Sequence, residues 1–328
     1  MARGVRWQSL LPYAALVIVI GLLPLVVRNA YHLSVIILIG TYALIAIGLS
    51  LLMGYAGQIS LGHAAFYGLG AYASAIGTTR YGLDPWLCIV LGMAVTAVVA
   101  YLIGRPTLQL RGHYLAMATL GIGIIMQIVF EEGGEFTGGH SGIAGIPRLA
   151  VGSLVFNTDL KLCYLVWPLA VVGLVLGANV VNSRVGRALR AIHDSEIAAR
   201  SCGVDVSALK LSIFVLSAVF ASVAGSLYAH NITFISPDPF GFHFSIMLVI
   251  MVIIGGSRSL WGALSGAAVV TVLGQLLLKL SERIPAIEGL DSVFFGVILI
   301  VAVMFMPGGL AGWLKSLRRN RSATEEAA

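Results

Sequence analysis

The sequence predicts an all-α polytopic membrane protein with about ten transmembrane helices and with both termini in the cytoplasm. Its composition supports this class, because 59% of the 328 residues are hydrophobic, only 10% are charged and the mean hydropathy is +0.97. A soluble domain usually carries roughly 25% charged residues. Apolar runs recur along almost the whole chain, and a backbone in lipid must pair its own polar groups, so we expect nearly all of them to be helices.

The ten apolar runs define the predicted spans in order. Arg3 and Arg6 precede the first run as in a signal peptide, but the run is too long and the residues after it make a poor cleavage site. The run at 244–256 is short, so we expect it to be either re-entrant or paired with the next run as a hairpin. The runs lie at 10–27, 33–53, 59–77, 86–104, 113–130, 162–182, 210–230, 244–256, 259–278 and 291–306.

The positions of the basic residues predict the orientation. With ten spans and a cytoplasmic N-terminus, 14 of the 20 Lys and Arg residues fall in cytoplasmic segments, which satisfies the positive-inside rule. The insert at 183–209 then faces the cytoplasm and the loop at 131–161 faces outward. We expect one transmembrane domain over 1–314 and a cytoplasmic tail over 315–328. The net charge of +6 reflects this topology and requires no nucleic-acid partner.

The polar insert at 183–209 has the pattern of a short amphipathic helix followed by a turn. Val185, Leu189 and Ile192 are spaced to share one helix face, and Glu196 and Arg200 form an i,i+4 pair. Gly203 follows as a residue suited to a left-handed helix end. Such a surface favours a contact with another protein; the alternative is an ordinary basic loop that only orients the chain.

A second polar segment interrupts the start of the third run. Residues 54–66 contain three glycines together with Gln58, Ser60 and His63. In transporters, glycine-interrupted helices expose backbone groups to the solute, and polar residues at membrane depth tend to line cavities. For His63 the alternative is a simple hydrogen bond to a neighbouring helix. The spacings Gly173–Gly177 and Gly262–Gly266 allow close helix packing.

The chain carries no convincing catalytic motif. No lysine follows a glycine, so there is no Walker A loop, and neither His-Glu-x-x-His nor Gly-x-Ser-x-Gly occurs. The three cysteines have no metal-binding spacing. Two weak patterns remain, a Gly-x-Ser-Gly at 139–142 in the outer loop and a Ser-x-x-Lys at 207–210. We therefore predict no enzyme, no catalytic or metal-binding residues and no cofactor in this chain.

Several segments in sequence order resemble the LivM-type permease subunits of branched-chain amino-acid ABC importers. The segment 255–266 keeps Gly255, Gly256, Gly262 and Gly266 of a family motif, but Ser257, Ser259 and Ala263 replace a glycine, a threonine and a proline. The other similar segments are Gly54–Phe66, Leu110–Leu120, Thr137–Pro147, Gly186–Gly203 and Met306–Gly312.

The resemblance implies a function in the bacterial plasma (inner) membrane. Such permeases pair with a second homologous subunit, two cytoplasmic ATPases that hydrolyse ATP, and an outer substrate-binding protein. Urea, amides or other small organic solutes are alternative substrates in this family, and a secondary transporter or channel could share the composition. The implied ATPase-coupling residues are Gly186, Arg187, Arg190, Glu196, Ala198, Ala199, Arg200 and Gly203. The candidate translocation-pathway residues are Gln58, Ser60, His63, Tyr114 and Thr119.

Overall fold

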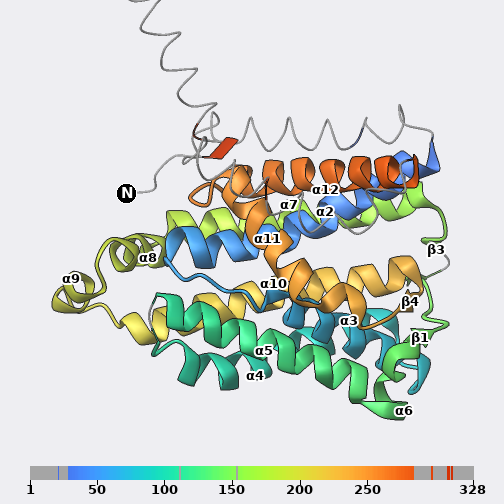
Figure 1. The fold of residues 1–328 in the computed structure, drawn as a ribbon, viewed down its shortest axis with the longest axis horizontal. Coiled ribbons are helices and arrows are strands. Elements are labelled where there is room, and N and C mark those ends of the chain that lie inside the picture. Colours follow the sequence, from blue (N-terminus) through green and yellow to red (C-terminus); the bar gives the residue numbers. More distant parts are fainter. Residues whose placement is uncertain are drawn as a thin grey trace, which may run out of the picture.

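The computed structural model describes residues 29–283 except 111 and 153, together with residues 21, 297, 309, 310 and 312. Figure 1 shows two layers of long helices: α2, α7 and α12 lie in one layer, and α3, α4, α5 and α10 in the other. The long helices are α2 (Ala30–Ser50), α3 (His63–Thr79), α4 (Pro85–Thr107), α5 (His113–Glu132), α7 (Asp159–Asn182), α10 (Val206–Ile232), α11 (Phe242–Gly255) and α12 (Leu260–Arg283).

Six of the described helices are long and apolar enough to cross a membrane, which confirms the all-α membrane class. A π-helical turn, Leu51–Tyr55, extends the first of them beyond α2. The helices α3 and α11 are shorter, with 17 and 14 residues, and they match the predicted runs at 59–77 and 244–256. The runs at 10–27 and 291–306 and the tail at 315–328 lie outside the described residues.

Polar side chains begin several helices where the sequence leaves the apolar pattern. The Asp84 carboxylate accepts hydrogen bonds from the backbone N–H groups of Trp86 and Leu87, and Pro85 occupies the first turn of α4. Thr158 and Asp205 cap α7 and α10 in the same way. These caps satisfy backbone donors that have no partner inside a helix.

Glycines set the closest helix contacts, as the small-residue spacings predict. A Cβ atom at Gly262 would lie 2.4 Å from the carbonyl oxygen of Gly255, and one at Gly266 would lie 1.9 Å from that of Met251. The helices α11 and α12 therefore pack backbone to backbone across the turn at 256–259. Gly173 similarly receives the side chain of Leu44 from α2.

The two main connections outside the long helices lie at opposite ends of the molecule (Figure 1). One end holds α6 (Gly134–Thr137), a 3-10 turn (Gly139–Ser141) and the antiparallel pairs β1–β4 (Ile143–Ala144 with Phe234–Ile235) and β2–β3 (Ala150–Val151 with Leu154–Val155). A second 3-10 turn, Asp238–Phe240, follows β4. The other end holds α8 (Arg184–Asp194) and α9 (Glu196–Ser201).

The insert at 183–209 is two helices, so the prediction of a single short helix is wrong. Ser195 takes an extended conformation, and its hydroxyl accepts from the N–H of Ala198. A serine that caps the next helix also ends the one before it, because the capping conformation is not helical. The insert is also shorter than predicted, since α10 already begins at Val206.

Candidate functional site

An unwound segment at 57–62 joins the π-helical turn to α3, where the sequence places its glycine-interrupted helix. Gly57 has a left-handed φ of +68°, and a Cβ atom at Gly62 would lie 2.3 Å from the carbonyl oxygen of Thr119. Glycine is needed at both positions, for conformation at the first and for close approach at the second. Gln58, Ser60 and His63 are all buried.

Hydroxyl groups from three other helices bond this segment and the first turn of α3. The His63 ring lies between two serines, with Nδ1 2.8 Å from Ser60 Oγ and Nε2 2.7 Å from Ser217 Oγ of α10. The N–H of Leu61 donates to Thr119 Oγ1 of α5, and the N–H of Ala64 donates to Ser245 Oγ of α11. Non-helical backbone is tolerated at membrane depth when protein groups pair it in this way.

Ser217 and Ser245 are site residues that the sequence reasoning missed. Each is a serine inside an otherwise apolar run, which is a weak signal that a search for buried polar partners could have used. The contact of Ser217 with His63 supports the simpler interpretation of this histidine, namely a hydrogen bond to a neighbouring helix.

Gln58 differs from its neighbours because its amide has no partner. Its side chain is 2% exposed, and neither Nε2 nor Oε1 makes a hydrogen bond in the part of the chain that the structure describes. An unsatisfied buried polar group costs about 1–3 kcal/mol. An amide offers two donors and an acceptor, so this group can bind a carboxylate, an ammonium, a carbonyl or water.

The candidate pathway residues divide into two groups. Gln58, Ser60, His63 and Thr119 gather around the unwound segment, whereas Tyr114 in the first turn of α5 is 73% exposed. The same helix exposes Met117, Ile125 and Ile128. The helix α5 thus has an inner face toward the unwound segment and an apolar outer face.

The helix α8 packs through part of the predicted apolar face. Leu189 and Ile192 are buried, but Val185 is largely exposed, and Gly186 takes its place because it approaches the backbone of Val181. Arg187 and Arg190 are exposed, and their guanidinium groups donate to the carbonyl oxygens of Ser183 and Val181.

The helix α9 is held by a contact that the i,i+4 pattern did not predict. The Glu196 carboxylate forms an ion pair with the Lys210 ammonium of α10, whose side chain is only 5% exposed. The N–H groups of Gly203 and Val204 close the helix on the carbonyl oxygens of Arg200 and Ala199, and Gly203 has a φ of +79°. The predicted left-handed glycine is therefore confirmed.

The outer surface of the α8–α9 pair combines basic and apolar side chains. Ile197 is 72% exposed, and Ala198 and Arg200 are also exposed, while Ala199 is buried against Ile192 and Val206. Arginine is enriched at protein–protein interfaces relative to the rest of the surface.

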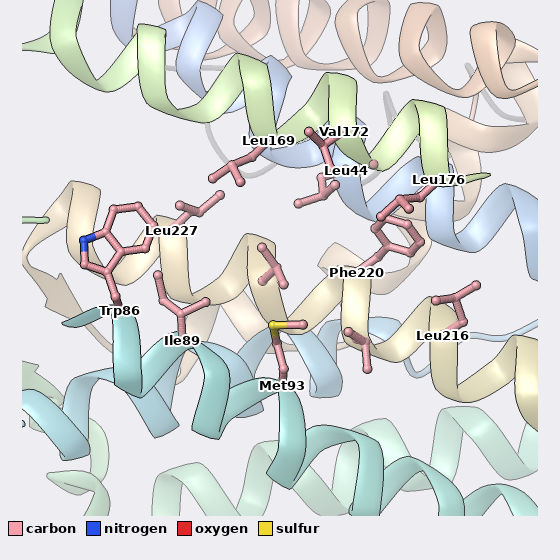
Figure 2. A pocket seen from close by; sticks show the side chains of 13 residues that line it. Leu44, Trp86, Ile89, Met93, Leu169, Val172, Leu176, Leu216, Phe220 and Leu227 are labelled. Carbon is pink, nitrogen blue, oxygen red and sulfur yellow. The ribbon is translucent and has the colours of Figure 1, made fainter. Parts of the chain in front are cut away.

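An apolar cavity of about 330 Å³ lies between α4, α7 and α10 (Figure 2). A charged solute there would leave its polar groups without partners, which disfavours this cavity as a solute site. In the described part of the chain, no three His, Cys, Asp or Glu side chains are placed to hold a metal ion. The cavity lining includes Trp86, Met93, Leu169, Leu176, Phe220 and Leu227.

Together these features describe a helical membrane protein with an unwound polar segment in its core and a charged helical pair at one end. This organisation suits a transport permease. Residues 31–303 match the family described as "Branched-chain amino acid transport system / permease component", and the chain belongs to this family.

The curated relatives carry consistent names. The chain is 31% identical over 326 residues to the high-affinity branched-chain amino acid transport system permease protein LivM of Salmonella typhimurium, covering 92% of this chain and 75% of the relative. It is 29% identical to the corresponding BraD protein of Pseudomonas aeruginosa, covering 83% and 92%. The permease protein LivH of Escherichia coli is 27% identical, covering 83% and 91%. No solved structure matches the chain.

Proposed function

We propose that this chain is the membrane subunit of an ABC importer that carries branched-chain or related small amino acids across the bacterial plasma membrane. Family membership is the observation that carries this proposal. We propose that the chain supplies no catalytic residues and no cofactor, and that the energy source is ATP hydrolysed by two partner ATPases.

The proposed second permease subunit is a homologue of this chain. The chain is similar to both LivM and LivH of Escherichia coli, at 30% and 27% identity, so one organism carries two related permease proteins of this family. The apolar outer face of α5, which includes Tyr114, is available for such a pairing. A substrate-binding protein on the outer side would complete the importer.

The proposed pathway follows the unwound segment. Gln58, Ser60, His63 and Thr119 supply the polar groups, and the unpaired Gln58 amide is the group best able to gain a partner from a passing amino acid. We propose Tyr114 as a pathway residue where α5 faces the second permease subunit.

The proposed ATPase contact is the α8–α9 pair. Arg187, Arg190 and Arg200 would form ion pairs across the interface, with the exposed Ile197 and Ala198 between them. The remaining predicted coupling residues support the helices that carry this surface. Gly186 and Ala199 are buried, Glu196 binds Lys210, and Gly203 ends α9.

The proposed topology has ten spans in a single domain over 1–314, with both termini and 183–209 in the cytoplasm and 131–161 outside. The placement of α8–α9 and the β-pairs at opposite ends supports this arrangement. In a variant without native cysteines, Ser141→Cys should react with an impermeant thiol reagent in intact cells, and Ser195→Cys should not. Both serines are exposed, so the reverse labelling would overturn the topology.

Reconstitution tests the function directly. The chain, its partner permease, the ATPases and the binding protein are placed in vesicles, and leucine uptake is measured with and without ATP. We expect uptake that requires ATP and the ATPases. Uptake of urea or acetamide in place of leucine would show that the substrates are urea or amides and not amino acids. Uptake without the ATPases would indicate a secondary transporter or channel.

A further inference from the structure

Gly57 and His193 bring the unwound segment into contact with the end of α8. A Cβ atom built on Gly57 would lie 2.9 Å from His193 Nδ1 and 3.5 Å from His193 Cα. The Nδ1 atom is buried and makes no hydrogen bond within the described residues. The imidazole therefore rests directly against the backbone of the unwound segment, in the space that a side chain at position 57 would fill.

A third segment joins the same place, the turn at 256–259 between α11 and α12. Arg258 lies beside Asp194, with 3.3 Å between Nη2 and Oδ1. The carbonyl oxygen of Arg258 accepts from the Tyr55 hydroxyl, and that of Ser257 accepts from the Ser50 hydroxyl. We name this meeting point the inner junction (residues 50–57, 193–194 and 256–259).

The contacts of the inner junction differ in strength. Asp194 and Arg258 are both mostly exposed, and exposed ion pairs contribute little to stability because water screens them. The contact of His193 with Gly57 is a packing contact against backbone, so α8 cannot move toward the segment without displacing it.

We propose that His193 is the positioning residue through which the α8–α9 pair sets the conformation of the unwound segment. The inference deepens the proposed function and rests on it. Gln58 follows Gly57 directly, so a movement of α8 that shifts Gly57 also shifts the unpaired Gln58 amide. An amide without a partner in one conformation favours a second conformation in which it has one, and His193 links that change to the ATPase surface.

Matched glycine substitutions separate this contact from general backbone strain. Gly57 and Gly82 have similar left-handed φ values, +68° and +60°, but a Cβ atom at Gly82 would meet nothing within 4 Å. In the reconstituted complex, Gly57→Ala should lower leucine uptake per ATP hydrolysed by at least tenfold. Gly82→Ala should stay within about twofold of the wild type, because it adds a similar backbone strain but no contact with a neighbouring atom.

Removal of the imidazole tests the same contact from the other side. His193→Ala should lower the uptake-to-hydrolysis ratio at normal membrane abundance, and adding it to Gly57→Ala should restore part of the lost ratio. A merely structural role would lower uptake and hydrolysis together. If the Gly57→Ala protein does not accumulate in the membrane, the uptake-to-hydrolysis ratio of His193→Ala is the test of the proposal.

Equal ratios for Gly57→Ala and Gly82→Ala, or an unchanged ratio for His193→Ala, would overturn the inference and leave the proposed function intact. Absence of ATP-driven leucine uptake by the wild-type complex would overturn the proposed function instead, and the inference with it.

Discussion

The two ends of the molecule are held together by different forces. At the β-strand end, each of the main contacts involves a backbone group: β1 pairs with β4, the Trp86 ring donates to the carbonyl oxygen of Ala150, and His230 Nδ1 lies 2.7 Å from that of Pro147. At the α8–α9 end, side chains dominate, through the Glu196–Lys210 pair and the Asp194–Arg258 pair.

The two kinds of contact restrict the chain in different ways. Backbone pairing through left-handed glycines fixes the chain path and tolerates little change in conformation. Side-chain pairing leaves each helix intact and can be rearranged by a new partner's charges. The β-strand end should therefore be sensitive to glycine substitution, and the α8–α9 end to charge substitution.

The largest expected effect is at Gly142. Its φ is +71°, and a Cβ atom there would lie 2.1 Å from the carbonyl oxygen of Ile235, so Gly142→Ala should disrupt the β1–β4 pair. We expect a loss of ~3 kcal/mol, from left-handed strain together with broken hydrogen bonds. Thermal unfolding of the purified protein in detergent measures it.

Gly145 provides the control for Gly142. It has a similar φ of +76°, but nothing lies within 4 Å of its Cβ position. Gly145→Ala should lose only the strain, ~1–2 kcal/mol. Equal losses in the two variants would show that the β1–β4 contact does not depend on the close approach.

The next effect is at Lys210, on the side-chain-held end. Lys210→Met removes the ammonium that pairs with the Glu196 carboxylate, and we expect a loss of ~1–3 kcal/mol, reduced from the fully buried case because Glu196 is 25% exposed. Glu196→Gln combined with Lys210→Met should recover most of it. Denaturation of both variants tests this, and an undiminished loss in the double variant would contradict a charge-pair origin.

A smaller effect is expected at Gly203, which tests whether backbone strain also matters at the α8–α9 end. Gly203 has a φ of +79° and open space around its Cβ position, so Gly203→Ala should lose ~1 kcal/mol and Gly203→Asn less, because asparagine visits this conformation more readily. Uptake and membrane abundance of the two variants should follow the same order. The reverse order would mean that side-chain bulk at the surface, and not the turn, limits uptake.

The sequence predicts the elements better than their contacts. Eight apolar runs appear as helices, and the interruption at 54–66 and the left-handed Gly203 are confirmed, because local rules of hydropathy and glycine conformation determine them. The partners Ser217 and Arg258 lie 154 and 64 positions along the chain from the residues they bind, and Lys210 lies 14 positions from Glu196 beyond the end of α9, so helix spacing alone cannot identify them. Ser195 was missed because a capping serine resembles any polar loop residue.

The smallest expected effect is a pH dependence at His193. Burial, and then the nearby Arg258 cation, lowers the pKa of His193 below its ordinary value of 6.5, while Asp194 opposes this shift. A lowered pKa in the folded state means that the unfolded state binds the proton more readily as the pH falls. The stability contribution of neutral His193 is therefore present above pH 6.5 and is lost as the pH falls below that value toward the folded-state pKa.

Comparison of variants isolates this contribution from other titrating groups. The unfolding temperature of the wild type should fall more steeply between pH 7 and pH 5 than that of His193→Gln, because only the wild type carries the imidazole. Asp194→Asn should steepen the fall, and Arg258→Gln should make it shallower, since the first removes the carboxylate that raises the pKa and the second the cation that lowers it. Identical slopes in the wild type and His193→Gln would show that the imidazole is as free to ionise in the folded protein as in the unfolded one, and that the inner junction does not bury it.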